Sequence, residues 1–313
     1  MYGSREFSFI AQNFLSNEIF ELKTQKSPTE KNNNLYLTYY LRFSKIISPF
    51  CAVCAFSGRL IGLYYKGGGN LALFTIGDLH LSLSVAKPMD VFGSRWENYT
   101  EKIKTGWENT VGENDTVLVA GDISWAMNAE ELKPDFDFIE ALPGKKILLK
   151  GNHDYWWQTQ AKLDKFLISN EYKTISFLHN NAYICEDFIL CGSRGWYDES
   201  KDNLVKNASN TKIIAREVQR IKFSLDAGCA LEDATHPREK IMFLHFPAIF
   251  KGYMCDEIIA TLYKYGIERC YYGHIHGNYE ARPVINYADI DFTLISSDYL
   301  NFIPMKIEPK KEK

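Results

Sequence analysis

The sequence predicts an α/β domain in which buried strands alternate with helices. Short apolar runs and segments of helical spacing follow one another from residue 71 almost to the end of the 313-residue chain. Apolar runs of this length are typical of strands that are buried on both faces. Hydrophobic residues make up 46% of the chain, which is enough for one large core or two small ones.

Strands are predicted where an apolar run ends in a polar cluster, as in "LALFTIGD" and "DTVLVAGD". In chain order, the predicted strands cover residues 71–78, 115–122, 145–154, 188–196, 240–247, 269–277 and 289–296. Helices are predicted where apolar residues recur at intervals of three and four. They cover residues 95–111, 131–142, 155–170 and 211–228. Together these elements predict one domain, about 71–305, followed by a charged tail at 306–313.

Residues 1–70 differ in character from this domain. They carry a net charge of +4, whereas the remainder carries −7, and the polar run "KTQKSPTEKNNN" is predicted to be unstructured. Lys-Gly-Gly-Gly followed closely by leucine is also what a ribosome-binding site and a UUG start codon would give when read in frame. We therefore expect Leu71, read as Met, to be an alternative start, and residues 1–70 to be an extension outside the functional fold.

Charge and hydropathy exclude several classes of protein. The net charge of −3 and the isoelectric point of about 6.2 do not favour a protein that binds nucleic acid through bulk charge. The most apolar segment, 46–65, is interrupted by Pro49 and Arg59 and is too short to span a bilayer. The seven cysteines are an odd number scattered through apolar stretches, which favours reduced thiols. We expect a cytoplasmic protein without a membrane span.

Polar clusters at the ends of the predicted strands are the candidate functional residues. The clusters are Asp78-x-His80, Gly121-Asp122, Gly151-Asn152-His153-Asp154, His245 and Gly273-His274-x-His276. Each alone is also typical of an ordinary turn or of a hydrogen-bonded histidine. Together they supply imidazole, carboxylate and amide ligands at the edge where open α/β sheets bind ligands. Such a set, without cysteine, suits two divalent ions of Mn, Fe, Zn or Ni.

This ordered series resembles the motifs of the calcineurin-like metallophosphoesterase superfamily over residues 78–276. Within it, "GDISWAM" and "KGNHDYWW" are similar to an uncharacterised group of bacterial predicted phosphohydrolases. The resemblance implies a four-layer α/β/β/α sandwich with two mixed sheets and a binuclear metal site. It implies that one ion is held by Asp78, His80, Asp122 and His276. It implies that the other is held by Asp122, as a bridge, with Asn152, His245 and His274.

The resemblance also implies the reaction and its catalytic residues. Two cations lower the pKa of a shared water, and the resulting hydroxide attacks a phosphoester. His153 then stabilises the developing charge or protonates the leaving oxygen. In phosphoprotein phosphatases an acid three positions after the bridging aspartate holds this histidine, but Trp125 stands here. Asp154 is the candidate substitute for that acid and is expected to be catalytic with His153.

The motifs also bear on the substrate. "GDISWAM" and "LKGNHD" lack the phosphate-binding arginines of the protein-phosphatase branch, so Arg194 in "GSRGWY" is the candidate phosphate clamp. The alternative is a structural arginine that bonds loop carbonyls. We expect a metal-dependent phosphohydrolase of small phosphoesters, a phosphodiesterase in preference to a phosphomonoesterase or protein phosphatase. A nuclease is disfavoured by the acidic domain, and a non-catalytic scaffold by the intact His153 and ligand set.

Overall fold

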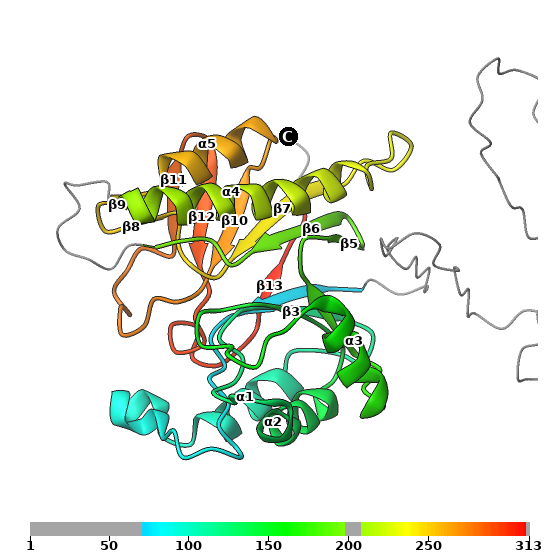
Figure 1. Ribbon diagram of the computed structural model, residues 1–313, viewed down its shortest axis with the longest axis vertical. Helices are drawn as coiled ribbons and strands as arrows, with labels where there is room; N and C mark the ends of the chain where they lie inside the picture. The colour runs from blue at the N-terminus through cyan, green and yellow to red at the C-terminus, as the bar shows by residue number, and fades with distance from the viewer. Residues whose placement is uncertain (1–70, 198–207, 311–313) are drawn as a thin grey trace, which may run out of the picture. The chain divides into compact units, whose positions relative to one another are not determined.

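Two β-sheets, each with a parallel centre, lie face to face in the middle of the molecule (Figure 1). This computed structural model describes residues 71–197 and 208–310, all of which belong to one unit, Ala55–Lys313. Residues 1–70 lie outside the described residues. This range includes the run predicted to be unstructured and the whole of the predicted N-terminal extension. None of the described helices is long and apolar enough to cross a membrane.

The first sheet has the strand order β13-β1-β2-β3-β4. Its strands are β1 (Leu73–Ile76), β2 (Thr116–Ala120), β3 (Lys145–Leu149), β4 (Ile175–Leu178) and β13 (Met305–Ile307). Strands β1 to β4 are parallel, whereas β13 is antiparallel to β1. Because parallel neighbours run the same way, the carboxyl ends of β1, β2 and β3 lie at one edge of this sheet.

The second sheet has the strand order β11-β12-β10-β7-β6-β5. Its strands are β5 (Ala182–Cys185), β6 (Phe188–Ser193), β7 (Glu239–Leu244), β10 (Arg269–Tyr272), β11 (Val284–Tyr287) and β12 (Ile290–Leu294). The four central strands are parallel, and the two edge strands are antiparallel. A two-stranded hairpin, β8 (Ile249–Phe250) with β9 (Tyr253–Met254), follows β7.

Helices cover the outer faces of both sheets. They are α1 (Tyr99–Glu108), α2 (Ala129–Ala141), α3 (Gln160–Ser169), α4 (Ala208–Cys229) and α5 (Asp256–Lys264). Figure 1 shows α1, α2 and α3 on one side of the paired sheets, and α4 and α5 on the other. The start of α2 is fixed by Asn128, whose side-chain oxygen accepts hydrogen bonds from the first turn of the helix.

Three apolar layers confirm the four-layer sandwich. Along β2, Val117 and Val119 face the layer beneath α1 to α3, whereas Leu118 and Ala120 face the layer between the sheets. This alternation is the two-residue period of a strand. The third layer lies between the second sheet and α4 and α5. Each central strand is therefore buried on both faces, which is why the sequence shows it as an apolar run.

Several elements differ from the sequence-based expectation. The helix expected at 155–170 begins only at Gln160, because Trp157 N bonds back to Asp154 O in a turn. Helix α5 and the short edge strands β4, β5 and β11 were not predicted. Strand β13 pairs with β1 through Ile307, so Lys306 and Ile307 belong to the sheet and not to the tail expected from 306.

Candidate metal centre

All seven predicted ligands lie at the carboxyl ends of strands from both sheets. Asp78 and His80 follow β1, Asp122 follows β2, Asn152 follows β3, His245 follows β7, and His274 and His276 follow β10. Six of them form two groups whose ligand atoms lie within 4.8 Å of one another, and each group is a candidate metal site. The first cluster is Asp78, His80 and His276. The second cluster is Asp122, His245 and His274.

The backbone at four of these residues is left-handed. The φ angles are 59° at Asp78, 46° at His80, 49° at Asp122 and 68° at His274. Residues other than glycine rarely adopt this conformation, which costs about 1–3 kcal/mol each and is concentrated at functional sites. The surroundings hold it in place: His274 N, for example, donates to both carboxylate oxygens of Asp78 at 2.9 Å.

Two glycines bring the neighbouring loops into contact with the carboxylates. A Cβ at Gly151 would overlap Asp122 Oδ1, and a Cβ at Gly273 would overlap Asp78 Oδ2. Neither glycine has a positive φ, so the requirement is space and not conformation. The glycines of "KGNHD" and "YYGHIHG" therefore allow these two loops to pack directly on the acidic ligands.

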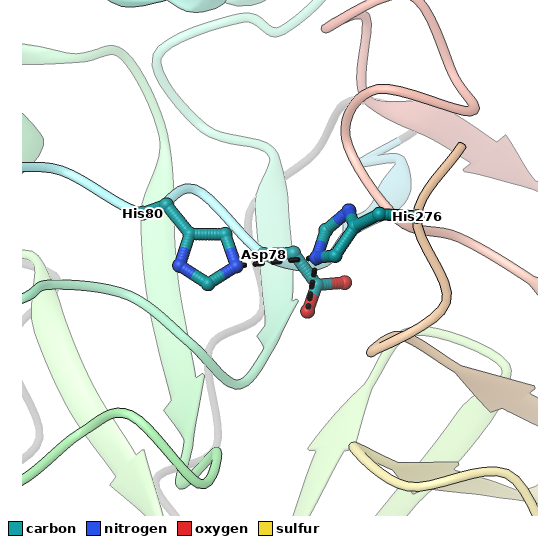
Figure 2. Close-up of side chains that lie close together, drawn as sticks. All are labelled: Asp78, His80 and His276. Atoms are coloured by element: carbon teal, nitrogen blue, oxygen red, sulfur yellow. Dashed lines mark hydrogen bonds and ion pairs between the residues drawn. The ribbon is translucent and has the colours of Figure 1, made fainter. Parts of the chain in front are cut away.

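The first cluster has the geometry of two imidazoles on one ion. Figure 2 shows the His80 and His276 rings and the Asp78 carboxylate turned toward one another. The two Nε2 atoms are 3.2 Å apart, and His276 Nε2 is 3.7 Å from Asp78 Oδ1. Imidazole nitrogens bound to a zinc-sized ion at about 2.1 Å lie about 3.0–3.4 Å from each other. The residues of this cluster fit a divalent metal ion.

Asp298 lies behind the first cluster and was not found from the sequence. Its Oδ1 accepts a hydrogen bond from His276 Nδ1 at 2.8 Å, and its Oδ2 accepts one from Gly277 N at 3.0 Å. Burial opposes charge on both partners, but the hydrogen bond lowers the pKa of Asp298 and raises that of His276. Because Nδ1–H of His276 donates to the carboxylate, Nε2 faces the cluster as a ligand, the usual arrangement behind a metal-binding histidine.

The second cluster brings acceptor atoms together. His245 is fully buried, and its Nδ1 donates to the carbonyl of Ala120 at 3.1 Å, so Nε2 carries a lone pair. That Nε2 lies 2.6 Å from Asn152 Oδ1 and 3.5 Å from Asp122 Oδ2, both of which are acceptors. Three converging acceptors are well suited to a cation between them, so this cluster also fits a metal ion.

Asp122 lies between the two clusters. Its Oδ2 is 3.7 Å from His80 Nε2 in the first cluster and 3.5 Å from His245 Nε2 in the second. It is also 3.9 Å from His153 Nε2. Its other oxygen accepts a hydrogen bond from His153 N at 2.8 Å. One carboxylate oxygen is therefore within reach of both candidate ion positions.

The electrostatics of the site favour added positive charge. Burial raises the pKa of Asp78 to about 7, and burial together with the nearby Asp154 and Asp78 raises that of Asp122 well above its usual range. Burial and the neighbouring imidazoles lower the pKa values of His80 and His245 well below the usual range. Burial destabilises the charged form of these acids and keeps these imidazoles neutral. A bound divalent cation would stabilise the carboxylates and accept the lone pairs of the neutral imidazoles.

The His153 ring packs on Trp125, and 31% of its side chain is exposed. The ring centroids are 4.2 Å apart, and Trp125 also stacks on His80 at 5.2 Å. At the position where protein phosphatases carry an acid, this chain therefore has an aromatic ring that contacts His153 and a candidate ligand. The contact restricts the orientation of the His153 ring by packing.

Asp154 is held by donors from two loops. Its carboxylate is fully buried and accepts hydrogen bonds from four donors, which are Ile123 N, Ser124 N, Gly151 N and Trp156 Nε1. These bonds join the loop after β2 to the loop after β3. The four bonds hold the backbone next to Asp122 and Asn152 in place, and the orientation of His153 by Asp154 stays a prediction.

Arg194 lies beside the second cluster but is paired with an acid. Its carbonyl accepts hydrogen bonds from His245 N and Phe246 N, and its Nη2 lies 3.2 Å from Glu217 Oε1. Glu217 on α4 is 1% exposed. Within residues 71–197 and 208–310, the Arg194 guanidinium is therefore directed to an acid on α4.

A family comparison agrees with this arrangement. The family model described as calcineurin-like phosphoesterase matches residues 73–278. Among solved structures, the protein of unknown function AQ665 from Aquifex aeolicus is 17% identical with a TM-score of 0.42, over 76% of this chain and 96% of that chain. TT1561 of Thermus thermophilus is 10% identical with a TM-score of 0.45, over 75% of this chain and 97% of that chain. No curated protein matches the chain. From the family match, which covers well over half of its length, the chain belongs to the calcineurin-like phosphoesterase family.

Proposed function

We propose that this protein is a metal-dependent phosphodiesterase that acts on small-molecule phosphoesters with two divalent ions. Membership of the family and the two candidate metal sites support a metal-dependent phosphoesterase in general. The observation that carries the two-ion proposal is the position of Asp122 Oδ2, which lies within 3.7 Å of an imidazole nitrogen from each cluster.

In this proposal the ions have distinct ligand sets. The first would be held by Asp78, His80, Asp122 and His276, and the second by Asp122, Asn152, His245 and His274. Bound divalent ions would lower the pKa of water and offset the charge on the phosphate oxygens. Asp298 keeps the His276 proton on Nδ1, and Ala120 keeps the His245 proton on Nδ1, so that both rings present Nε2 to the centre.

His153 is the proposed proton donor to the leaving oxygen. It adjoins the bridging carboxylate without belonging to either cluster, and part of its side chain is open to solvent. An imidazole has a pKa close to neutral and can therefore donate a proton to a leaving alkoxide. Trp125 packs against the ring and limits the directions in which it can deliver that proton.

The preference for diesters is supported by charge. A phosphomonoester carries a charge of about −1.5 to −2 at pH 7, whereas a diester carries one negative charge. The arginines that bind the extra charge in protein phosphatases are missing from "GDISWAM" and "LKGNHD". The singly charged diester is therefore the better match to the site.

The test is hydrolysis by protein reconstituted with Mn or Zn. We expect kcat/KM for bis(p-nitrophenyl) phosphate to exceed that for p-nitrophenyl phosphate by at least about tenfold. Asp122→Asn should abolish both activities, whereas His236→Ala, a change at an exposed histidine outside the site, should abolish neither. Faster hydrolysis of the monoester would overturn the diester preference, and failure to bind metal or to hydrolyse either ester would overturn the proposal as a whole.

A further inference from the structure

Three basic side chains gather beside the second cluster around one buried acid. They are Lys150 after β3, Arg194 after β6 and Arg220 on α4, and we refer to them as the basic cluster. Glu217, which is 1% exposed, pairs with Arg194 at 3.2 Å and also with Arg220 Nη1. The Arg194 and Arg220 side chains are 27% and 50% exposed, so solvent and solutes can reach them.

The basic cluster lies where the ends of β3 and β6 meet. A Cβ at Gly192 in β6 would lie 3.2 Å from a side-chain carbon of Leu149, the last residue of β3. Close packing between these strand ends brings Lys150, the next residue after β3, near to Arg194, the next residue after β6. Burial lowers the pKa of Lys150, and the charged groups near enough to shift it further are Arg194, Asp154, Arg220 and Glu217.

The same strand ends connect the basic cluster to the candidate metal centre. Strands β6 and β7 are parallel neighbours, and Arg194 O accepts the hydrogen bond of His245 N. The Arg194 guanidinium lies 5.9 Å from the Phe246 ring, which in turn contacts the His274 ring at 4.5 Å. On the other sheet, Lys150 is two residues from Asn152. The basic cluster therefore borders the second cluster directly.

Among the residues that the structure describes, the positive charges of the basic cluster outnumber the acids paired with them. Two arginines pair with Glu217, and Lys150 adds a third positive charge nearby. The other acid near Lys150 is Asp154, whose oxygens already accept four hydrogen bonds. Arg194 Nε is buried without an acceptor among the described residues, although nearly all buried donors are satisfied in proteins. Like charges held together in this way are stabilised by an anion with several acceptor oxygens, and guanidinium groups bind phosphate especially well.

We propose that the basic cluster is a second phosphate subsite, which binds a phosphate group of the substrate other than the one that is hydrolysed. The inference rests on the proposed function and refines it. The substrate class is then a phosphodiester that carries a further phosphate on the same molecule, for example on a nucleoside or sugar. Glu217 has a positioning role, because it holds both arginines in the subsite.

The test uses two diesters that differ only in the second phosphate. They are the p-nitrophenyl ester of thymidine 5′-phosphate and the same ester with an added 3′-phosphate, with release of p-nitrophenolate as the readout. The reconstituted wild-type protein should show a KM about tenfold or more lower for the 3′-phosphorylated ester, the effect of one charge-assisted contact. Arg220→Gln and Lys150→Gln should each reduce this advantage to less than about threefold. Arg216→Gln, a change at an exposed arginine one turn away on α4, should retain it.

Binding measurements separate this inference from the proposed function. By calorimetry, reconstituted wild-type protein should bind thymidine 3′,5′-bisphosphate at least about tenfold more tightly than thymidine 5′-phosphate, whether or not the esters are hydrolysed. Arg220→Gln should remove that difference while its thermal unfolding temperature stays close to wild type. Equal affinity of the wild type for the two nucleotides overturns the inference. Weaker binding of inorganic phosphate alone in Arg220→Gln, without a bisphosphate preference, would assign the subsite to free phosphate and would also overturn it.

Discussion

The two candidate metal clusters orient their histidines through different partners. In the first cluster, the buried carboxylate of Asp298 accepts a hydrogen bond from Nδ1 of His276. In the second cluster, the backbone carbonyl of Ala120 accepts a hydrogen bond from Nδ1 of His245. A carboxylate makes the imidazole a more basic ligand than a neutral carbonyl does. Two sites built from similar ligands are therefore expected to differ in affinity, with the first ion held more tightly.

The largest effect is expected from Asp122→Ala, which removes the proposed bridging ligand between the two clusters. Loss of this carboxylate leaves the two cations without their bridge, so their repulsion is restored. Metal content should fall from about two ions per chain to less than one, and kcat/KM should fall by more than about 10³-fold. Elemental analysis and diester hydrolysis measure the two effects. The comparison variant is His80→Ala, which should lose about one ion; equal occupancy in the two variants would show that Asp122 is not the bridge.

His153→Ala should leave both clusters intact and reduce the chemistry. The variant is expected to keep its metal content and its unfolding temperature, while kcat falls by about 10²–10⁴-fold for esters with poor leaving groups. The loss should be smaller for p-nitrophenyl esters, because p-nitrophenolate leaves without a proton. An equal loss for leaving groups of widely different pKa would instead assign His153 to electrostatic stabilisation of the phosphate. Loss of metal would make it a ligand.

Asp298→Asn tests the difference between the clusters directly. The amide keeps the shape of the side chain but removes the negative charge behind His276, so the affinity of the first ion should fall by about 10- to 100-fold. Affinity for the second ion should change by less than about threefold, because Ala120 still orients His245. Titration of metal-free protein with Zn gives both constants. A similar loss at both sites would mean that Asp298 supports the centre as a whole.

The smallest effect is expected from Trp125, which contacts His153 and the His80 ring of the first cluster. Trp125→Ala removes the packing on the His153 ring and should lower kcat by about tenfold through misorientation, with KM and metal content close to wild type. Trp125→Phe keeps an aromatic face and should restore most of the rate. Reduced metal content in Trp125→Ala would instead show that the main role of the ring is to hold His80 in position as a metal ligand.

The sequence predicts the central strands and the candidate ligands for the same physical reason. Parallel strands buried on both faces appear as apolar runs, and the ligands follow where those runs end, as with Asp78 and His245. Helix α5 and the edge strands β4, β5 and β11 were missed because they are short, with nine residues in the helix and four in each strand, so their patterns have few positions in which to repeat. Strand β13 could not be separated from the charged tail, since its three residues include Lys306 and its pairing with β1 spans most of the chain.

Contacts between segments that are distant along the chain could not be predicted from the sequence. Asp298 follows β12 in the run "LISSDYL", where only its position after a strand distinguishes it from other acids. Its role depends on β12 lying beside β10, which places it against His276. The four donors to Asp154 and the pairing of Glu217 with two arginines likewise come from loops and helices that meet only in the fold.

The separation of the ligands along the chain has a consequence for the order of events during synthesis. Asp78 and His276, which belong to the first cluster, are 198 positions apart in the chain. The second cluster is likewise incomplete until His274 has been synthesised. A growing polypeptide therefore displays Asp78, His80 and Asp122 long before either site has all its ligands. Neither candidate site can be complete until nearly all of the domain has left the ribosome. Binding of metal at these sites would therefore be a late step of maturation.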